Sequence, residues 1–388
     1  MFLLLGDPIV YWMLKLIVFA IMLFCGWQIT KLKASGREFW YWSTPVIVAY
    51  SLFIGLRWNR GADYPHYYQD LTGKLFADYD EPLYLWWIDF FKATELPFWI
   101  AFIFYSFLLI LGVTFIIKKY PKYAVWAYPV FFVLSGSAEN LIRQYFAAAF
   151  ILFAVYQYLL DSKRSKYYIL LYCVCAVSIH NSALFPIAVC VGIEVAKRYK
   201  YLNNVYIPLA LFLFTYFFWD EKYFQFVSDW MQTLDVSGED NRLAGYMDNS
   251  DRWFTSEGNL NVIMGRAAVV ASLLNQVAMF FTYFFVVLIG WYITKKDAKF
   301  TIIYWLAFWA IILKNISGSI EMYGRLYEWL VMFIPYVVAA VATTDYPQKY
   351  KYLKYVIVVC FLMQFAYYGV VISIGSMGYA GCAFIWDR

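Results

Sequence analysis

The stretch Arg57-Trp58-Asn59-Arg60-Gly61-Ala62-Asp63-Tyr64-Pro65-His66-Tyr67-Tyr68 follows an apolar run, Pro45 to Leu56. It therefore marks the point at which a predicted membrane helix ends and the chain enters water. Two arginines, an aspartate and a histidine stand close together in it. Ionisable groups next to hydrocarbon are costly, so those that occur there usually pair with one another or serve function. The stretch indicates ion pairs or a functional site at the end of a membrane helix.

Composition places the chain among integral membrane proteins. Of its 388 residues, 63% are hydrophobic and 15% are charged, whereas soluble proteins carry roughly 25% charged residues. Apolar runs long enough to cross a bilayer recur from one end to the other. The net charge of +5 is spread over short turns without a basic stripe, which argues against nucleic acid as a partner. The sequence predicts an all-α, polytopic protein in which residues 1–388 form a single transmembrane domain.

We expect about twelve membrane-spanning helices, within a range of about ten to thirteen. Two long connections join them, 57–97 and 219–264, and the second is acidic. Amphipathic, aromatic-rich segments predict an interfacial helix in each connection, at Glu81–Lys92 and at Asp220–Asp235. The predicted spans are 9–30, 42–56, 98–117, 124–137, 139–160, 167–179, 181–196, 202–218, 265–293, 299–316, 325–343 and 355–374.

Basic residues gather in alternate turns, which the positive-inside rule assigns to the cytoplasm. The other turns, both long connections and both termini are then expected to lie outside. Asp7 precedes the first basic residue, and no small-residue cleavage site follows the first apolar run, so we expect the first span to be retained. The basic turns contain Lys31, Lys33, Arg37; Lys118, Lys119, Lys122; Lys163, Arg164, Lys166; Lys197, Arg198, Lys200; Lys295, Lys296, Lys299; and Lys349, Lys351, Lys354.

The polar residues that interrupt apolar runs gather at the predicted outer ends of the spans. Several arginines at one depth suit a phosphate or pyrophosphate group, which guanidinium binds with bidentate geometry. An alternative for Arg57 and Arg60 is contact with lipid phosphates, since long basic side chains extend toward the membrane surface. The candidate residues are Arg57, Asn59, Arg60, Asp63, Tyr64, His66, Glu139, Asn140, Arg143, Gln144, His180, Asn181, Arg266, Tyr323 and Arg325.

The spacing of Glu139 and Arg143 along the predicted helix indicates which way Arg143 points. They stand four residues apart, and Asn140, Arg143, Gln144 and Ala147 share one helix face. The small residues from Ala147 onward let another helix approach closely. We therefore expect Arg143 to point into the bundle, with an ion pair to Glu139 on the same helix as the alternative.

Three residues are candidates for a general base. His180 follows an apolar run, and the unperturbed pKa of a histidine suits removal of a proton from a sugar hydroxyl at neutral pH. The alternative for His180 is a structural hydrogen bond. Asp63 and Glu139 are the carboxylate candidates, but each has a cation nearby that would keep it ionised and a poor base.

Metal and redox chemistry find little support in the sequence. Only Cys382 of the six cysteines is expected to be exposed, and the six predict neither a disulfide framework nor a metal set. No P-loop, HExxH or GxSxG motif is present. Asp78-Tyr79-Asp80 is the one Asp-x-Asp pair, and it leaves a metal-dependent mechanism open as an alternative. We expect no metal and no cofactor.

Three motifs in order resemble one known family. They are Arg57…Gly61-Ala62-Asp63-Tyr64…Tyr67, Asn140-Leu141-Ile142-Arg143-Gln144, and Ile179-His180-Asn181-Ser182-Ala183. Together they resemble the EpsG-type exopolysaccharide polymerases, relatives of the Wzy O-antigen polymerases. The resemblance implies a GT-C-like glycosyltransferase of the bacterial inner membrane, active at its periplasmic or external face. It would join oligosaccharide repeat units carried on undecaprenyl pyrophosphate, without a nucleotide sugar.

The resemblance also implies roles and partners. Donor and acceptor are both lipid-linked glycans in contact with membrane lipids, and a flippase and a chain-length regulator are candidate protein partners. Arg57, Arg60, Arg143, Arg266 and Arg325 would bind the pyrophosphate and neutralise it as it leaves. His180, Asp63 or Glu139 would activate the acceptor hydroxyl in an inverting, single displacement.

Two other functions remain open. A lipid-linked oligosaccharide transporter would line a path through the bundle with polar groups at several depths. Here the deep polar residues are neutral amides such as Asn275 and Gln364, which often join membrane helices. A membrane acyltransferase acting on glycans would also use a histidine, but it would not need so many arginines at one level.

Overall fold

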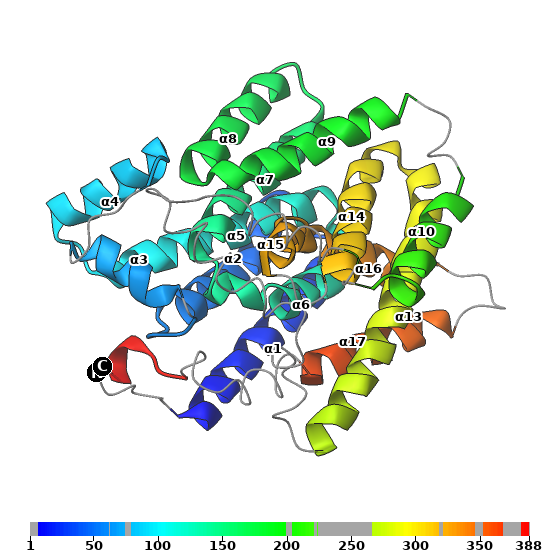
Figure 1. The fold of residues 1–388 in the computed structure, drawn as a ribbon, viewed down its shortest axis with the longest axis horizontal. Coiled ribbons are helices and arrows are strands. Elements are labelled where there is room, and N and C mark those ends of the chain that lie inside the picture. The colour runs from blue at the N-terminus through cyan, green and yellow to red at the C-terminus, as the bar shows by residue number, and fades with distance from the viewer. Residues whose placement is uncertain are drawn as a thin grey trace.

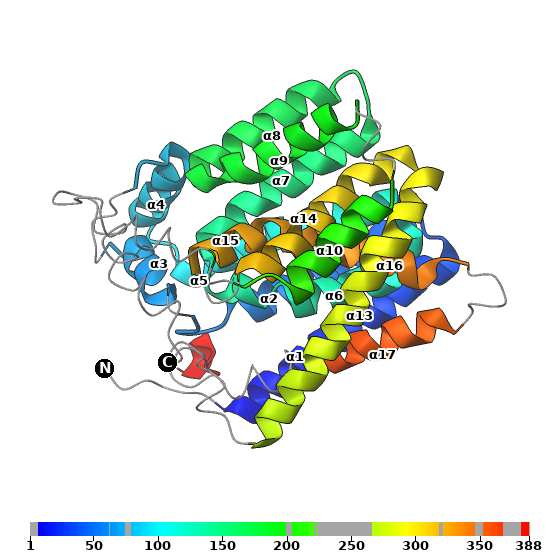
Figure 2. The same ribbon diagram turned by 45° about the vertical axis from the view of Figure 1, so that its right-hand side comes forward.

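The computed structural model describes residues 7–61, 63–73, 79–198, 204–220, 223, 266–317, 321–345, 352–367 and 382–387. Over these residues the regular secondary structure is helical apart from one isolated antiparallel bridge, so the predicted all-α class is confirmed. Figures 1 and 2 show long helices packed as one bundle, with the short helices α3 and α4 at its left-hand end.

The α-helices are α1 (Pro8–Leu32), α2 (Gly36–Gly55), α3 (Tyr64–Leu71), α4 (Pro82–Thr94), α5 (Phe98–Lys119), α6 (Ala124–Leu134), α7 (Ile142–Leu160), α8 (Ser165–Ile179), α9 (Leu184–Ala196), α10 (Tyr206–Phe217), α13 (Arg266–Lys296), α14 (Thr301–Ser317), α15 (Glu321–Leu330), α16 (Ile334–Thr343) and α17 (Leu353–Ala366). The 3-10 segments are η1 (Pro121–Tyr123), η2 (Gly136–Glu139), η3 (Asn181–Ala183), η9 (Ala298–Phe300), η10 (Val331–Phe333) and η13 (Ile385–Asp387).

Every predicted span overlaps one of these helices. Four shorter apolar helices of 10–17 residues also occur in the described chain. The protein is therefore a multi-pass membrane protein, while the count of twelve crossings and the GT-C-like arrangement stay predictions. The described stretches that are long and apolar enough to cross a bilayer are Ile9–Leu32, Phe98–Lys119, Ser272–Lys296, Ala298–Ser317 and Gly324–Thr343.

Two predicted spans are interrupted in the structure. In the span predicted at 139–160, η2 ends at Glu139 and α7 begins only at Ile142. In the span predicted at 325–343, η10 separates α15 from α16. Pro335 stands in the first turn of α16, where its missing N–H breaks no helical hydrogen bond. Both interruptions place side chains in directions that one continuous helix would not allow.

Small residues bring α5 and α7 into close contact, as the sequence predicts for the alanines of α7. A Cβ on Gly112 of α5 would stand 3.2 Å from the backbone oxygen of Ala149 and 2.9 Å from Cβ of Leu152. Deeper in the bundle, the Gln364 amide donates to Thr282 Oγ1 at 2.8 Å and joins α17 to α13. This neutral amide fits the predicted role of joining helices.

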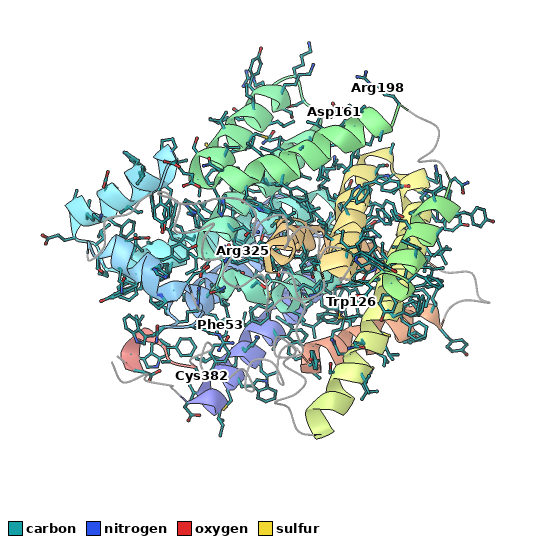
Figure 3. The ribbon with its side chains drawn as sticks, viewed as in Figure 1. Phe53, Trp126, Asp161, Arg198, Arg325 and Cys382 are labelled. Atoms are coloured by element: carbon teal, nitrogen blue, oxygen red, sulfur yellow. The ribbon has the colours of Figure 1, made fainter. Side chains whose placement is uncertain are left out.

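The basic turns next to Thr30, Pro121, Asp161 and Lys299 lie at one end of the bundle, and Tyr120 of the second packs against Phe300 of the fourth at 5.5 Å. Thr30 Oγ1, next to the first basic turn, donates to the backbone oxygen of Pro121 in the second at 3.4 Å. Lys299 Nζ lies 3.3 Å from Asp161 Oδ2, which joins two further turns. Figure 3 shows Asp161 on the side of the molecule opposite Cys382. These described turns therefore share one end of the bundle, while the assignment of that end to the cytoplasm stays a prediction.

The described C-terminal segment is packed into the other end, so the prediction that Cys382 is exposed is wrong. Cys382 is 6% exposed. The backbone N–H of Trp58 donates to Ala383 O at 2.8 Å, and the N–H of Ile385 donates to Leu56 O at 2.9 Å. The segment thus covers the end of α2 and buries the cysteine beneath it.

The structure describes one of the two segments that are predicted to form interfacial helices. The segment Glu81–Lys92 is helical, because α4 runs from Pro82 to Thr94. The second segment, Asp220–Asp235, lies almost entirely outside the described residues, as does most of the acidic connection 219–264.

Candidate functional site

The opening stretch docks onto the segment before α7. Gly61 has φ +99°, and a Cβ at this position would stand 2.9 Å from Cα of Asn140. The side-chain oxygen of Asn140 accepts a hydrogen bond from the Asp63 N–H at 2.9 Å. Glycine is therefore required here for its conformation and for the close approach. This docking brings the arginines of the stretch to Glu139.

Glu139 contacts both arginines of the opening stretch. Its carboxylate binds the Arg60 guanidinium and accepts a hydrogen bond from the Tyr11 hydroxyl at 2.6 Å. Arg60 also lies over the Tyr11 ring, 4.2 Å from its centroid. Burial opposes ionisation of Glu139, but the charges of Arg60, Lys15 and Arg57 outweigh it and lower the pKa of Glu139 to about 2. Glu139 is thus a charged partner of the cations and a poor base.

Arg57 is a structural cation. It is 2% exposed, and its guanidinium donates to the backbone oxygens of Ile54 and Glu139, the latter at 2.5 Å. Its own backbone oxygen accepts a hydrogen bond from the Tyr64 hydroxyl at 2.9 Å. Arg57 therefore holds the end of α2 against Glu139 and positions Arg60.

Arg143 points into the bundle as predicted, but its partner is a residue that the sequence did not single out. Nη1 of Arg143 lies 2.7 Å from Oε2 of Glu81, the residue before α4. The guanidinium also lies over the Tyr79 ring at 4.4 Å. The other oxygen of Glu81 accepts from the Asn181 N–H at 3.3 Å. The alternative pair with Glu139 is not formed, because η2 and α7 are separate helical segments.

Tyr67 of α3 lies in the field of two candidate arginines. Burial raises its pKa to about 12, although the positive charges of Arg143 and Arg325 act in the opposite direction. The Gln144 amide donates to the backbone oxygen of Arg325 at 2.8 Å and fixes α15 against α7. Arg143 and Arg325 thus form a second arginine group, distinct from the pair at Glu139.

A polar cavity of about 250 Å³ lies beside the Glu139 group, and we refer to it as the charged cavity. Three cations and two carboxylates face it, which leaves one excess positive charge. Its cations come from α1, the opening stretch and the end of α14. The lining residues are Lys15, Arg60, Val133, Leu134, Gly136, Ser137, Glu139, Lys314, Tyr327 and Glu328.

Glu328 is the cavity carboxylate that sequence reasoning missed. Ser137 Oγ donates to its Oε1 at 2.8 Å, and the Tyr145 hydroxyl donates to its Oε2 at 2.5 Å. A signal for it exists in the sequence, because Glu328 is a charge within a predicted span, one helical turn after Arg325.

Other predicted residues lie outside the cavity lining. His180 Nδ1 is 2.9 Å from Ser182 Oγ, which also accepts from Trp329 Nε1 at 3.3 Å. His180 therefore contacts the helix that carries Glu328 without lining the cavity itself. Asn59 is partly exposed and His66 is exposed.

Some of the predicted site residues have side chains outside the described residues. Arg266 and Tyr323 belong to α13 and α15, but their side chains are outside the described residues, and so are Ala62 and Asp78. In the part of the chain that the structure describes, no three His, Cys, Asp or Glu residues are grouped so as to hold a metal ion.

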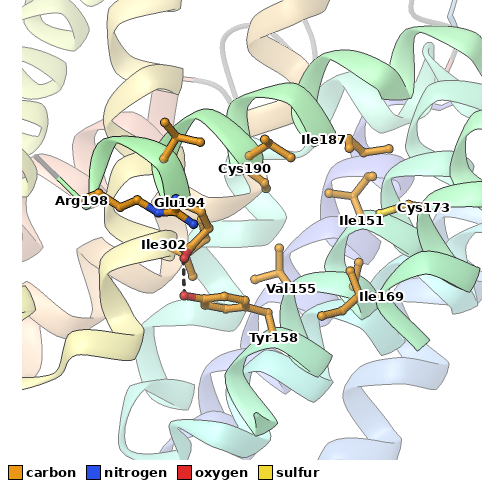
Figure 4. Close-up of a pocket in the computed structure, with 13 residues that line it drawn as sticks. Ile151, Val155, Tyr158, Ile169, Cys173, Ile187, Cys190, Glu194, Arg198 and Ile302 are labelled. Atoms are coloured by element: carbon orange, nitrogen blue, oxygen red, sulfur yellow. Dashed lines mark hydrogen bonds between the residues drawn. The ribbon is translucent and has the colours of Figure 1, made fainter. Parts of the chain in front are cut away.

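A larger cavity of about 380 Å³ lies between α7, α8 and α9 (Figure 4). Its lining is mainly aliphatic. The Tyr158 hydroxyl donates to Glu194 at 2.9 Å where these helices approach the basic end. It is therefore remote from the charged cavity, which adjoins the opposite ends of the bundle helices.

Comparison with known families decides the classification. The model of the EpsG family matches residues 40–380, most of the chain. The chain belongs to the EpsG family. The match spans the opening stretch, Glu139, Arg143, His180 and Glu328. EpsG-family proteins are associated with glycosyltransferase-like polymerase activity in polysaccharide biosynthesis. No curated protein and no solved structure matches the chain.

Proposed function

We propose that this EpsG-family protein is a polysaccharide polymerase that joins oligosaccharide repeat units carried on undecaprenyl pyrophosphate. The reaction transfers a glycan from one lipid carrier to the end of another glycan and releases the first carrier as its diphosphate. It takes place at the external face of the bacterial inner membrane and needs no nucleotide sugar, because the donor is already activated by its diphosphate.

The charged cavity carries this proposal. A departing diphosphate gains negative charge as the glycosidic bond breaks, and fixed cations stabilise that charge without reorganising. Lys15, Arg60 and Lys314 face one cavity from three separate segments. The cavity is at the end of the bundle opposite the basic turns, where a lipid diphosphate at the external surface can reach it.

We assign the residues predicted from the sequence different roles in the proposed polymerisation. Arg60 contacts the diphosphate directly, and Arg57 positions it. Arg143, which is paired with Glu81, and Arg325 stay predicted phosphate ligands. His180 is a positioning residue that holds Ser182 against Trp329. Arg266 remains a predicted phosphate ligand.

The arrangement supports a polymerase over a transporter. A transport path needs polar groups through the depth of the bundle. In the described chain Arg60, Glu139 and Lys314 lie near helix ends, and the deep amide of Gln364 is hydrogen-bonded between α13 and α17.

The test uses purified protein in nanodiscs with lipid-linked repeat units extracted from the cells that make this protein. We expect a ladder of polymer lengths without nucleotide sugar. The Lys314→Gln variant should elongate at least about tenfold more slowly, because a cavity cation is worth more than 1.4 kcal/mol to the departing charge.

A matched control is Lys295→Gln. Both lysines stand near the end of a helix over an aromatic ring, Lys314 over Tyr327 at 5.3 Å and Lys295 over Trp291 at 4.5 Å. Lys295 belongs to the basic end and should keep wild-type elongation. Absence of any ladder from the wild type, or normal elongation by Lys314→Gln, contradicts the proposal.

A further inference from the structure

We propose that Glu328 is the general base that removes the proton from the acceptor sugar hydroxyl in the charged cavity. This inference rests on the proposed polymerase function and adds a catalytic residue to it. The acceptor oxygen would be activated on one side of the cavity, while Lys15, Arg60 and Lys314 receive the diphosphate.

The position of the carboxylate is fixed from two directions. Ser137 belongs to η2 and Tyr145 to α7, and each donates a hydroxyl to a different oxygen of Glu328. An ionised carboxylate offers about four acceptor positions, so these two bonds leave capacity for a substrate hydroxyl. A base must be held within hydrogen-bond reach of the proton that it removes. The two donors provide that orientation before substrate binds.

The second carboxylate of the cavity is a poor candidate for the same task. Glu139 is bound directly by Arg60 and Tyr11. Lys314 lines the same cavity and its positive charge acts on Glu328, but among the described residues no cation forms an ion pair with Glu328 within 4.0 Å. Glu328 is partly buried, and a partly buried carboxylate without a bound cation accepts a proton more readily than a paired one. The two acids of the cavity are therefore suited to different roles, one to hold cations and one to accept a proton.

The step is balanced as a single displacement. The acceptor hydroxyl gives its proton to a carboxylate oxygen of Glu328, and its oxygen forms a bond to the anomeric carbon of the donor. The bond between that carbon and the diphosphate oxygen breaks, and the diphosphate leaves with the electron pair. The proton then passes from Glu328 to the released diphosphate or to water, which restores the carboxylate.

The test is Glu328→Gln, which keeps the size of the side chain and an oxygen that accepts a hydrogen bond. Turnover should fall at least about 100-fold, the usual minimum for loss of a general base. The affinity for undecaprenyl pyrophosphate in nanodiscs should stay within about threefold of wild type. The acid limb of the pH profile of kcat should disappear from the residual activity, and Glu328→Asp should retain that limb.

Glu194→Gln is the matched control. Glu194 is another carboxylate on a membrane helix that accepts a hydrogen bond from a tyrosine hydroxyl, that of Tyr158. It lies in the aliphatic cavity of Figure 4, so its variant should elongate polymer normally.

A second variant, Tyr145→Phe, keeps the ring and removes one bond that orients Glu328. It should lower kcat several-fold and leave lipid diphosphate binding unchanged. If the wild type forms no polymer, the proposed function itself fails. If the wild type is active and Glu328→Gln keeps its turnover, or loses diphosphate binding together with turnover, the role of general base is overturned.

Discussion

Arg143 binds Glu81, with 2.7 Å between Nη1 and Oε2, although Glu139 stands only four residues before it. The partner is 62 residues away in the sequence. Because Glu81 also accepts the Asn181 N–H, this one carboxylate connects the start of α7, the start of α4 and the turn before α9. It joins α4 to the bundle together with the packing of Trp87 against Phe104 and Phe146.

Breaking the ion pair between Arg143 and Glu81 should lower the free energy of unfolding. Removing one partner of a buried ion pair leaves the other charge unsatisfied, at about 3–5 kcal/mol. We expect Arg143→Gln and Glu81→Gln each to lower the free energy of unfolding by about that amount in detergent. A double-mutant cycle should give a coupling energy above about 1.5 kcal/mol. The exposed pair Asp161 and Lys299 is the control, with an expected coupling of at most about 1 kcal/mol. Additive effects of the two single variants would contradict the pairing.

Gly61→Ala should disrupt the docking of the opening stretch. The backbone conformation at φ +99° is strained for any side chain, and the new Cβ would press on Asn140. We expect a loss of about 1–3 kcal/mol in unfolding free energy, with a parallel loss of polymerisation. Gly192→Ala, at a helical site with open space around it, should be neutral or slightly stabilising. Equal stability of the two variants would show that the close approach is absent.

Truncation of Phe384 should separate the C-terminal segment from the bundle. Its ring is 1% exposed and packs against Tyr11 at 5.9 Å and Phe53 at 6.0 Å. Phe384→Ala should cost about 3–5 kcal/mol in unfolding free energy and make Cys382 reactive toward a maleimide in the folded protein. Trp386→Ala, at a side chain that is 58% exposed, should cost under about 1 kcal/mol. Slow maleimide labelling of both variants would rule out this account of the segment.

Stability should fall in acid because of Glu139. Although burial acts in the opposite direction, the charges of Arg60 and Lys15 hold the pKa of the Glu139 carboxyl well below its usual range, at about 2. A lowered carboxyl pKa stabilises the fold above the unfolded value, and that contribution is lost as pH falls below the usual carboxyl range toward about 2. Glu139→Gln should therefore be less stable than wild type at neutral pH and lose less stability over that interval. Thermal unfolding in detergent from pH 6 to pH 3 measures the difference, and parallel curves would refute it.

The sequence anticipates the helices well and their interruptions poorly. The apolar runs at 9–30 and 98–117 correspond to α1 and α5, because hydrophobic length is a local property of the chain. The breaks after Glu139 and Leu330 were not anticipated, since each depends on packing against other helices.

The candidate site was anticipated in part. The sequence places Arg60, Glu139 and Arg143 at one end of the bundle, because an ionisable residue in an apolar run is itself the signal. It did not separate them into two groups, and it missed Glu81 and Glu328. The partner of a buried charge is set by packing, which leaves no local pattern to recognise.

The sequence by itself determined that the protein is all-α, that several of its helices are long and apolar enough to cross a membrane, and its family motifs. These properties follow from hydrophobic length and charge pattern, which act over one helix at a time. Only the tertiary structure decided which charges meet. Ser137 and Glu328 lie 191 residues apart and still share a hydrogen bond, because the packing of η2 against α15 brings them to one cavity.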